Sequence, residues 1–142
     1  MSGRYVFHGT GENIAVLEPQ QAFTRVNGVR QEDGPAAVFA SSSADYAIFF
    51  AVFSKKNCPL GRKASVSDFE VEGSTYRLSF KASANTLSQI DDSSSGWVYV
   101  FDRDQFYLRQ PGGIEYANRQ VVKPLNKIRV TRKDLLGAVA TL

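Results

Sequence analysis

Hydrophobic and polar positions are most clearly organised over residues 36–53, where the pattern predicts a strand followed by a helix. Residues 36–40 are a continuous apolar run after a Gly-Pro pair, which is typical of a buried strand. Ser41–Ser43 can accept hydrogen bonds from the free N–H groups of a helix start, and Asp45 suits the positive end of the helix dipole. Four aromatic rings follow at i, i+3, i+4 and i+7 and share one face of the predicted helix: Tyr46, Phe49, Phe50 and Phe53.

This aromatic face is expected to be buried, and Tyr46 permits two interpretations. Its spacing alone favours the first ring of a core stripe. Its phenol and its place beside the helix start also suit the wall of an apolar slot for a flat ligand.

The N-terminal segment predicts a strand and then a short helix. Arg4–His8 is rich in aromatic and β-branched residues, and alternation places Tyr5 and Phe7 on one face. Gly9–Gly11 is expected to end this strand in an open turn, because glycine allows a sharp turn or a close approach to a ligand. Glu12–Leu17 carries enough apolar residues for a short helix that a following proline would end.

Two polar segments predict loops. Gln20–Gly34 contains an Asn-Gly turn signal, and a connection of this length in a small domain is usually a binding loop or a mobile lid. Lys55–Lys63 is basic and is interrupted by a proline and a glycine.

The second half of the chain reads mainly as strands. Ala64–Val71 and Thr75–Ala82 predict a hairpin with its turn at Glu72–Ser74. Trp97–Phe101 is the most strand-like run, and Asp102 can cap one helical turn after it. Further strands are predicted at Ile114–Ala117, Val121–Val122 and Ile128–Thr131.

The predicted fold class is α+β. Six or seven short strands accompany one firm helix, and Lys133–Leu142 is expected to be a weak turn with a loose tail. The segments do not alternate as strand and helix, so a mixed or antiparallel sheet is favoured over a doubly wound parallel one. A length of 142 residues predicts a single domain, residues 1–142.

Composition narrows the class of protein. The sequence contains neither a run of ~20 apolar residues nor the apolar region of a signal peptide, so a cytoplasmic protein without membrane contact is expected. One cysteine, Cys58, excludes an internal disulfide and a cysteine-based zinc site within one chain. The net charge of +3 is mild, and the basic bias of the last quarter of the chain is typical of a solvated face, although such a segment can attract phosphates.

Most standard enzyme motifs are absent from the sequence. It has no phosphate-binding GxxxxGK[ST], no GxGxxG after a strand, no GxSxG and no HExxH. A nucleophile pair of Cys58 and His8 is disfavoured, because nothing near Cys58 in sequence would orient it.

Three separated motifs carry the remaining polar residues: Phe7–Thr10, then Val38–Ala40 with Ser43–Tyr46, and then Glu115–Tyr116. In this order they resemble the histidine, tyrosine and glutamate signature of ADP-ribosyltransferases of the diphtheria-toxin and poly(ADP-ribose) polymerase type. The resemblance implies a small split β-sheet core with one main helix, and NAD as the substrate.

The resemblance also implies a role for each motif residue. His8 would hydrogen-bond a ribose hydroxyl of NAD, and Gly9 would pair its backbone with the nicotinamide carboxamide, which Ser43 would also contact. Tyr46 would stack on the nicotinamide ring. Glu115 would bind the 2′-hydroxyl of the nicotinamide ribose and stabilise the positive charge that develops as the glycosidic bond breaks.

The same motifs place Thr10, Phe39 and Ala40 among the residues that bind NAD. The chain has no room for the added domains of the polymerases, so transfer of a single ADP-ribose, as in a small toxin-like enzyme, is expected. The acceptor, a protein or a nucleic acid among other possibilities, is not encoded in a readable motif. Two alternatives remain: an NAD-using enzyme that resembles an RNA 2′-phosphotransferase, and a binding module for nucleotides or nucleic acid without catalysis.

Overall fold

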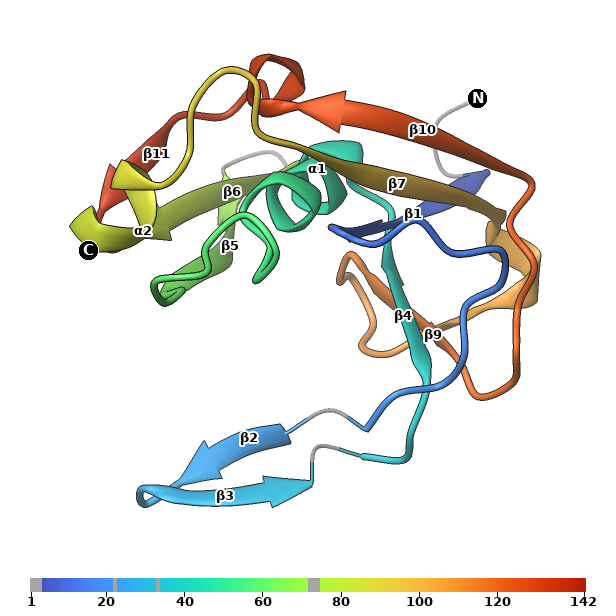
Figure 1. Ribbon diagram of the computed structural model, residues 1–142. Helices are drawn as coiled ribbons and strands as arrows, with labels where there is room; N and C mark the ends of the chain where they lie inside the picture. The colour runs from blue at the N-terminus through green and yellow to red at the C-terminus, as the bar shows by residue number, and fades with distance from the viewer. Residues whose placement is uncertain (1–3, 22, 33, 72–74) are drawn as a thin grey trace.

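A six-stranded antiparallel sheet forms the main layer of the protein. A computed structural model describes residues 4–21, 23–32, 34–71 and 75–142. The strands of this sheet, in spatial order, are β10 (Asn126–Thr131), β7 (Ser95–Asp102), β1 (Tyr5–Thr10), β4 (Val38–Ser41), β9 (Glu115–Asn118) and β8 (Tyr107–Leu108). The β1 strand lies near the middle, where its neighbours β7 and β4 are distant from it in sequence (Figure 1).

A second sheet and a separate hairpin complete the strands. The second sheet has the order β11 (Val139–Thr141), β6 (Thr75–Ala82) and β5 (Ala64–Val71), and β11 runs parallel to β6. The hairpin of β2 (Phe23–Val26) and β3 (Val29–Glu32) extends away from the other elements (Figure 1). Asn27 and Gly28 both have positive φ, as a two-residue hairpin turn requires. The predicted loop at Gln20–Gly34 is therefore built around a hairpin.

The main helix, α1 (Ala44–Val52), lies between the two sheets (Figure 1). Ser43 caps it, since its hydroxyl accepts from the backbone N–H of Tyr46 at 3.2 Å, as predicted. One core cluster joins α1 to both sheets through Phe49, Phe80 and Val98. A second cluster, on the opposite face of the main sheet, contains Val6, Leu17, Val38, Ala40, Tyr99, Phe101 and Val122.

Close contact between α1 and the main sheet depends on two glycines. A Cβ atom on Gly9 of β1 would lie 1.7 Å from the carbonyl oxygen of Ala47, and one on Gly96 of β7 would lie 2.1 Å from that of Ala51. The helix backbone therefore rests directly on two neighbouring strands. Any larger residue at either glycine would push α1 away from the sheet.

The aromatic face of α1 is divided between the core and a pocket. Phe49 and Phe53 are fully buried, and their rings stack with centroids 4.7 Å apart. Tyr46 and Phe50 are only partly buried and line cavities. The expectation that all four rings are buried is thus wrong, because α1 turns its small residues toward β1 and β7 and leaves two rings at the edge of the contact.

The α+β class with mostly antiparallel strands is confirmed, and the predicted bounds of β5 and β6 match the structure. The predicted turn at Glu72–Ser74 lies outside the described residues. The minor helices are α2 (Ala84–Ser88), η1 (Arg103–Gln105) and η2 (Arg132–Asp134), and Asp102 caps η1 as predicted. In the described residues, no helix has the length and apolar character needed to cross a membrane.

Several predicted elements require correction. Glu12–Leu17 is not a helix: the segment is irregular and contains bends, with Leu17 paired to Val122 and the backbone N–H of Ile14 bound to the Tyr99 hydroxyl. The described residues form eleven strands, more than the six or seven expected. The additional strands are short. β2 and β3 form a local hairpin within a polar segment, β8 has two residues, and β11 gains its pairing from β6, which is distant in sequence.

The C-terminal segment is an integral part of the fold, contrary to the prediction of a loose tail. The carboxylate of Asp45 accepts hydrogen bonds from the backbone N–H groups of Leu136 and Gly137, at 2.8 and 2.9 Å. The chain then continues into β11 beside β6. A carboxylate near the helix start thus serves both the helix dipole and the attachment of the tail.

Candidate active site

The main sheet opens between β1 and β4. These two strands share one register pair, Phe7 with Ser41. Over its remaining length β1 continues alongside β7, whereas β4 continues alongside β9. The two strands therefore diverge beyond this pair, and side chains from both can face the space that results.

His8 bridges the point of divergence. Its Nδ1 lies 2.6 Å from the carbonyl oxygen of Phe39 on β4. A carbonyl can only accept, so Nδ1 carries the proton and Nε2 of the neutral ring is an acceptor. Burial lowers the pKa of His8, and the hydrogen bond to Phe39 opposes this effect in part. The imidazole is thus held neutral in one orientation, with its second nitrogen able to accept a hydrogen bond.

A cavity of about 280 Å³ occupies the space between β1, β4 and α1, and we call it the cleft. Its apolar walls include Tyr46 and Phe50 of α1, whose ring centroids are 5.0 Å apart. Its polar residues are His8, Ser41 and Glu115. An aromatic wall beside a few converging polar groups is typical of a binding site for a small, partly aromatic ligand.

Glu115 enters the cleft from β9, opposite Ser41 in the register. Its carboxylate forms an ion pair with the guanidinium of Arg109, which itself lies 5.1 Å from the centroid of the Phe39 ring. The backbone N–H of Arg109 also donates to the Glu115 carbonyl, at 3.0 Å. The turn that joins β8 to β9 therefore presents the carboxylate and its cation together.

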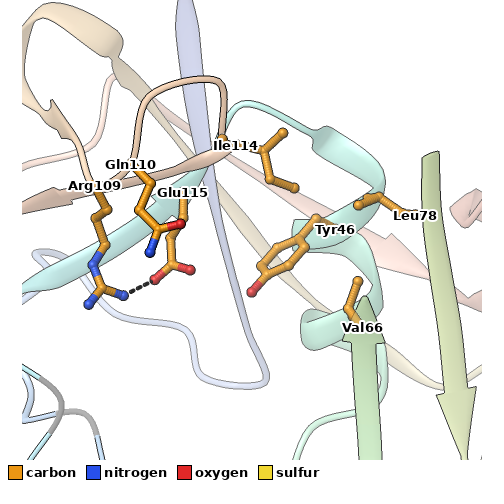
Figure 2. Close-up of a pocket in the computed structure, with 8 residues that line it drawn as sticks. Tyr46, Val66, Leu78, Arg109, Gln110, Ile114 and Glu115 are labelled. Carbon is orange, nitrogen blue, oxygen red and sulfur yellow. Dashed lines mark hydrogen bonds and ion pairs between the residues drawn. The ribbon is translucent and has the colours of Figure 1, made fainter. Parts of the chain in front are cut away.

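A second cavity of about 320 Å³ adjoins the cleft through Tyr46 and Glu115, which line both. Figure 2 shows the Tyr46 ring with Val66 and Leu78 on one side of this cavity, and Glu115 with Arg109 and Gln110 on the other. The Glu115 carboxylate can thus be approached from two cavities.

Most of the residues that the resemblance selects lie together. Six of them line the cleft: His8, Gly9, Phe39, Ala40, Tyr46 and Glu115. Thr10 lies outside it and lines a third cavity next to Gly9. Ser43 does not line it either, because its side chain caps α1.

Ser41 and Arg109 line cavities at this site but were not singled out from the sequence. The Ser41 side chain is 1% exposed, and its hydroxyl oxygen accepts from the backbone N–H of Ser43 at 3.0 Å. Three consecutive serines gave no local sign of which one faces the cleft. Arg109 lies six positions before Glu115, across a Pro-Gly-Gly turn that could have suggested a cross-strand pair.

Glycine at position 9 also has a packing role. Ligand contact was expected to demand a residue without a side chain there. The structure adds a second reason, because an added Cβ would collide with the backbone of α1 at Ala47.

Cys58 does not contribute to the cleft. Its side chain is 3% exposed, and burial raises the pKa of its thiol, an effect that Arg62 partly opposes. A buried, protonated thiol is a poor nucleophile. The pairing of Cys58 with His8 that the sequence disfavoured therefore gains no support.

No protein-family model matches this chain, and neither the curated proteins nor the solved structures include a significant match.

Proposed function

We propose that the protein is an NAD-dependent mono-ADP-ribosyltransferase. The observation that supports this proposal is the convergence of His8, Tyr46 and Glu115 from three distant segments on one cleft. These are the positions that resemble the signature of the family. The divergence of β1 from β4 also suits the split sheet that the resemblance implies.

The walls of the cleft suit the nicotinamide end of NAD. The ring would lie against Tyr46, and apolar contact with Phe50 would extend that surface. Nε2 of His8 would accept a hydrogen bond from a ribose hydroxyl, which needs the neutral imidazole that burial favours. Gly9 lines the cleft beyond the register pair of β1 with β4, and its backbone would bind the carboxamide there.

Glu115 would act on the bond that breaks. The bond between the anomeric carbon and the nicotinamide nitrogen cleaves, nicotinamide leaves with the electron pair, and positive charge develops on the ribose. A carboxylate close to that charge stabilises the transition state electrostatically. The acceptor then forms a bond to the anomeric carbon and loses its proton, and water serves as the acceptor in simple hydrolysis.

The decisive experiment is nicotinamide release from NAD by the wild type and by Glu115→Gln. The substitution keeps the size of the side chain and removes its charge, so we expect a loss of roughly 10²–10³-fold in rate. Glu18→Gln is the matched control, because Glu18 is exposed and does not line the cleft, and it should retain full activity. Thermal melting of each variant shows whether the fold is retained.

Two results would contradict the proposal. Equal release by the wild type and by Glu115→Gln would show that this carboxylate does not take part in cleavage. Binding of NAD without any release, with water or with protein and nucleic-acid acceptors, would favour a non-catalytic binding module.

A further inference from the structure

The third cavity, of about 420 Å³, lies beside the cleft and has a basic lining, so we call it the basic pocket. It is formed where the end of β1 faces the segment that follows α1. Three cationic side chains line it, Lys55, Lys56 and Arg62, against one carboxylate, Glu12. Its other lining residues are Gly9, Thr10, Gly11, Phe50 and Ser54. The excess of positive charge indicates an anionic ligand.

The basic pocket adjoins the cleft. Gly9 and Phe50 line both cavities, so a ligand long enough to extend past these two residues can reach from the cleft to the basic pocket. The cavity that shares Tyr46 and Glu115 with the cleft has one cation, Arg109, which already pairs with Glu115. A further cavity shares Phe7 with the cleft, and its lining has one cation, Arg129, and one carboxylate, Asp134. Of these three neighbours of the cleft, the basic pocket has the largest excess of positive charge and is the best match for a diphosphate.

Arg62 is fixed in place at the end of α1. Its Nε–H donates to the carbonyl of Phe53, the C-cap residue, and its guanidinium carbon lies 5.4 Å from the centroid of the Phe50 ring. The C-terminal end of a helix repels anions, because its carbonyl groups carry partial negative charge. The guanidinium of Arg62 offsets this charge. It is planar and offers several N–H donors, and because it is already held beside the pocket, an anion can bind it at little cost in side-chain entropy.

Lys55 and Lys56 complement this fixed group. Both are exposed and directly follow α1 and Ser54, so their flexible ammonium groups can adjust to the oxygens of a phosphate. Thr10 adds a hydroxyl on the β1 side, which can donate to a phosphate while its oxygen accepts from the backbone N–H of Glu12.

We propose that the basic pocket binds the diphosphate of a dinucleotide whose nicotinamide end occupies the cleft, an assignment that rests on the proposed function. Lys55–Lys63 then recognises the substrate NAD and not the acceptor. Binding in this pocket adds affinity for ligands that carry a diphosphate and adds none for nicotinamide alone.

The test compares the affinities of ADP-ribose and nicotinamide, measured by calorimetry and by NMR titration of the full chain. Lys55→Gln/Lys56→Gln should weaken ADP-ribose binding about tenfold and leave nicotinamide binding unchanged. Lys123→Gln/Lys133→Gln removes the same charge from exposed residues outside the basic pocket and should leave both affinities unchanged. Arg62→Gln should weaken ADP-ribose further, with thermal melting to confirm folding.

The failures of the two proposals are distinguishable. If the wild type binds both ligands but Lys55→Gln/Lys56→Gln weakens ADP-ribose no more than the control pair does, the diphosphate assignment is overturned and the proposed function stands. If the wild type binds neither ligand and releases no nicotinamide, the proposed function is itself overturned, and the assignment with it.

Discussion

The cleft has two walls of different construction. The inner wall is formed by β1, β4 and α1, and its members Ser41 and Ala47 are each 1% exposed. The outer wall is formed by β9 and the turn before it, where the side chains of Arg109 and Glu115 are 27% and 42% exposed. One wall is held by backbone packed on backbone, and the other by an ion pair near solvent.

Because of this difference, substitutions in the inner wall should mainly affect stability, and substitutions in the outer wall should mainly affect the proposed reaction. The inner wall belongs to the core, so changes there should be detected first as lost stability. A partly exposed ion pair contributes at most about 1 kcal/mol to folding, so changes in the outer wall should leave the fold almost unaffected. The position of a carboxylate can nevertheless affect a reaction rate strongly.

The largest expected effect is on the inner wall. Gly9→Ala would place a Cβ 1.7 Å from the carbonyl oxygen of Ala47, and α1 would have to move. We expect a loss of roughly 3 kcal/mol in the free energy of unfolding and a fall of roughly 10 °C in Tm. Differential scanning calorimetry measures both.

Gly96→Ala is the matched variant, because Gly96 contacts the same helix but does not line the cleft. It should destabilise the protein by a similar amount. If Gly9→Ala has the same Tm as the wild type but no longer binds NAD, then contact with the ligand, and not packing against α1, requires glycine at position 9.

A substitution in the outer wall should affect folding less than one in the inner wall and should affect catalysis clearly. Arg109→Gln removes the cation that orients Glu115, so the rate of nicotinamide release should fall roughly 10- to 100-fold. The Tm should change by only about 2–3 °C. Arg119→Gln, whose guanidinium lies over Tyr107 at the same sheet edge, is the control and should leave the rate unchanged. A wild-type rate in Arg109→Gln would exclude the positioning role.

The smallest expected effect is a pH dependence of stability from the inner wall. Burial lowers the pKa of His8, so the unfolded chain takes up a proton at a higher pH than the folded protein does. Neutral His8 thus contributes stability above about pH 6.5, and this contribution is lost progressively as the pH falls below that value.

His8 is the single histidine in the sequence, so one substitution removes the whole histidine contribution to the pH dependence of stability. Melting at about pH 7.5 and about pH 5.5 should show a larger fall in Tm for the wild type than for His8→Asn, whose amide can still donate to Phe39. Equal falls in the two proteins would contradict the proposed effect of burial on His8.

Some elements that are specified by residues close together in sequence were predicted correctly. The hairpin of β5 and β6 follows from alternation, and the start of α1 follows from the Ser43 cap. The motif residues His8, Tyr46 and Glu115 were also selected from the sequence alone, through their resemblance to a family signature. The hairpin and the helix cap depend on residues a few positions apart, and each of the three motifs is itself short, so local patterns in the sequence reveal them.

Tertiary structure decided which residues meet, because contact between distant segments depends on register and packing. The pairing of Glu115 with Ser41 follows from how β9 aligns with β4, and the neighbour of Glu115 proved to be Arg109. The C-terminal segment is attached to Asp45, and the basic pocket adjoins the cleft at Gly9 and Phe50, only because the folded chain brings these distant segments together. The sequence by itself determined which side chains are available. The tertiary structure, in which α1 packs directly on Gly9 and Gly96, determined which of them line the cleft.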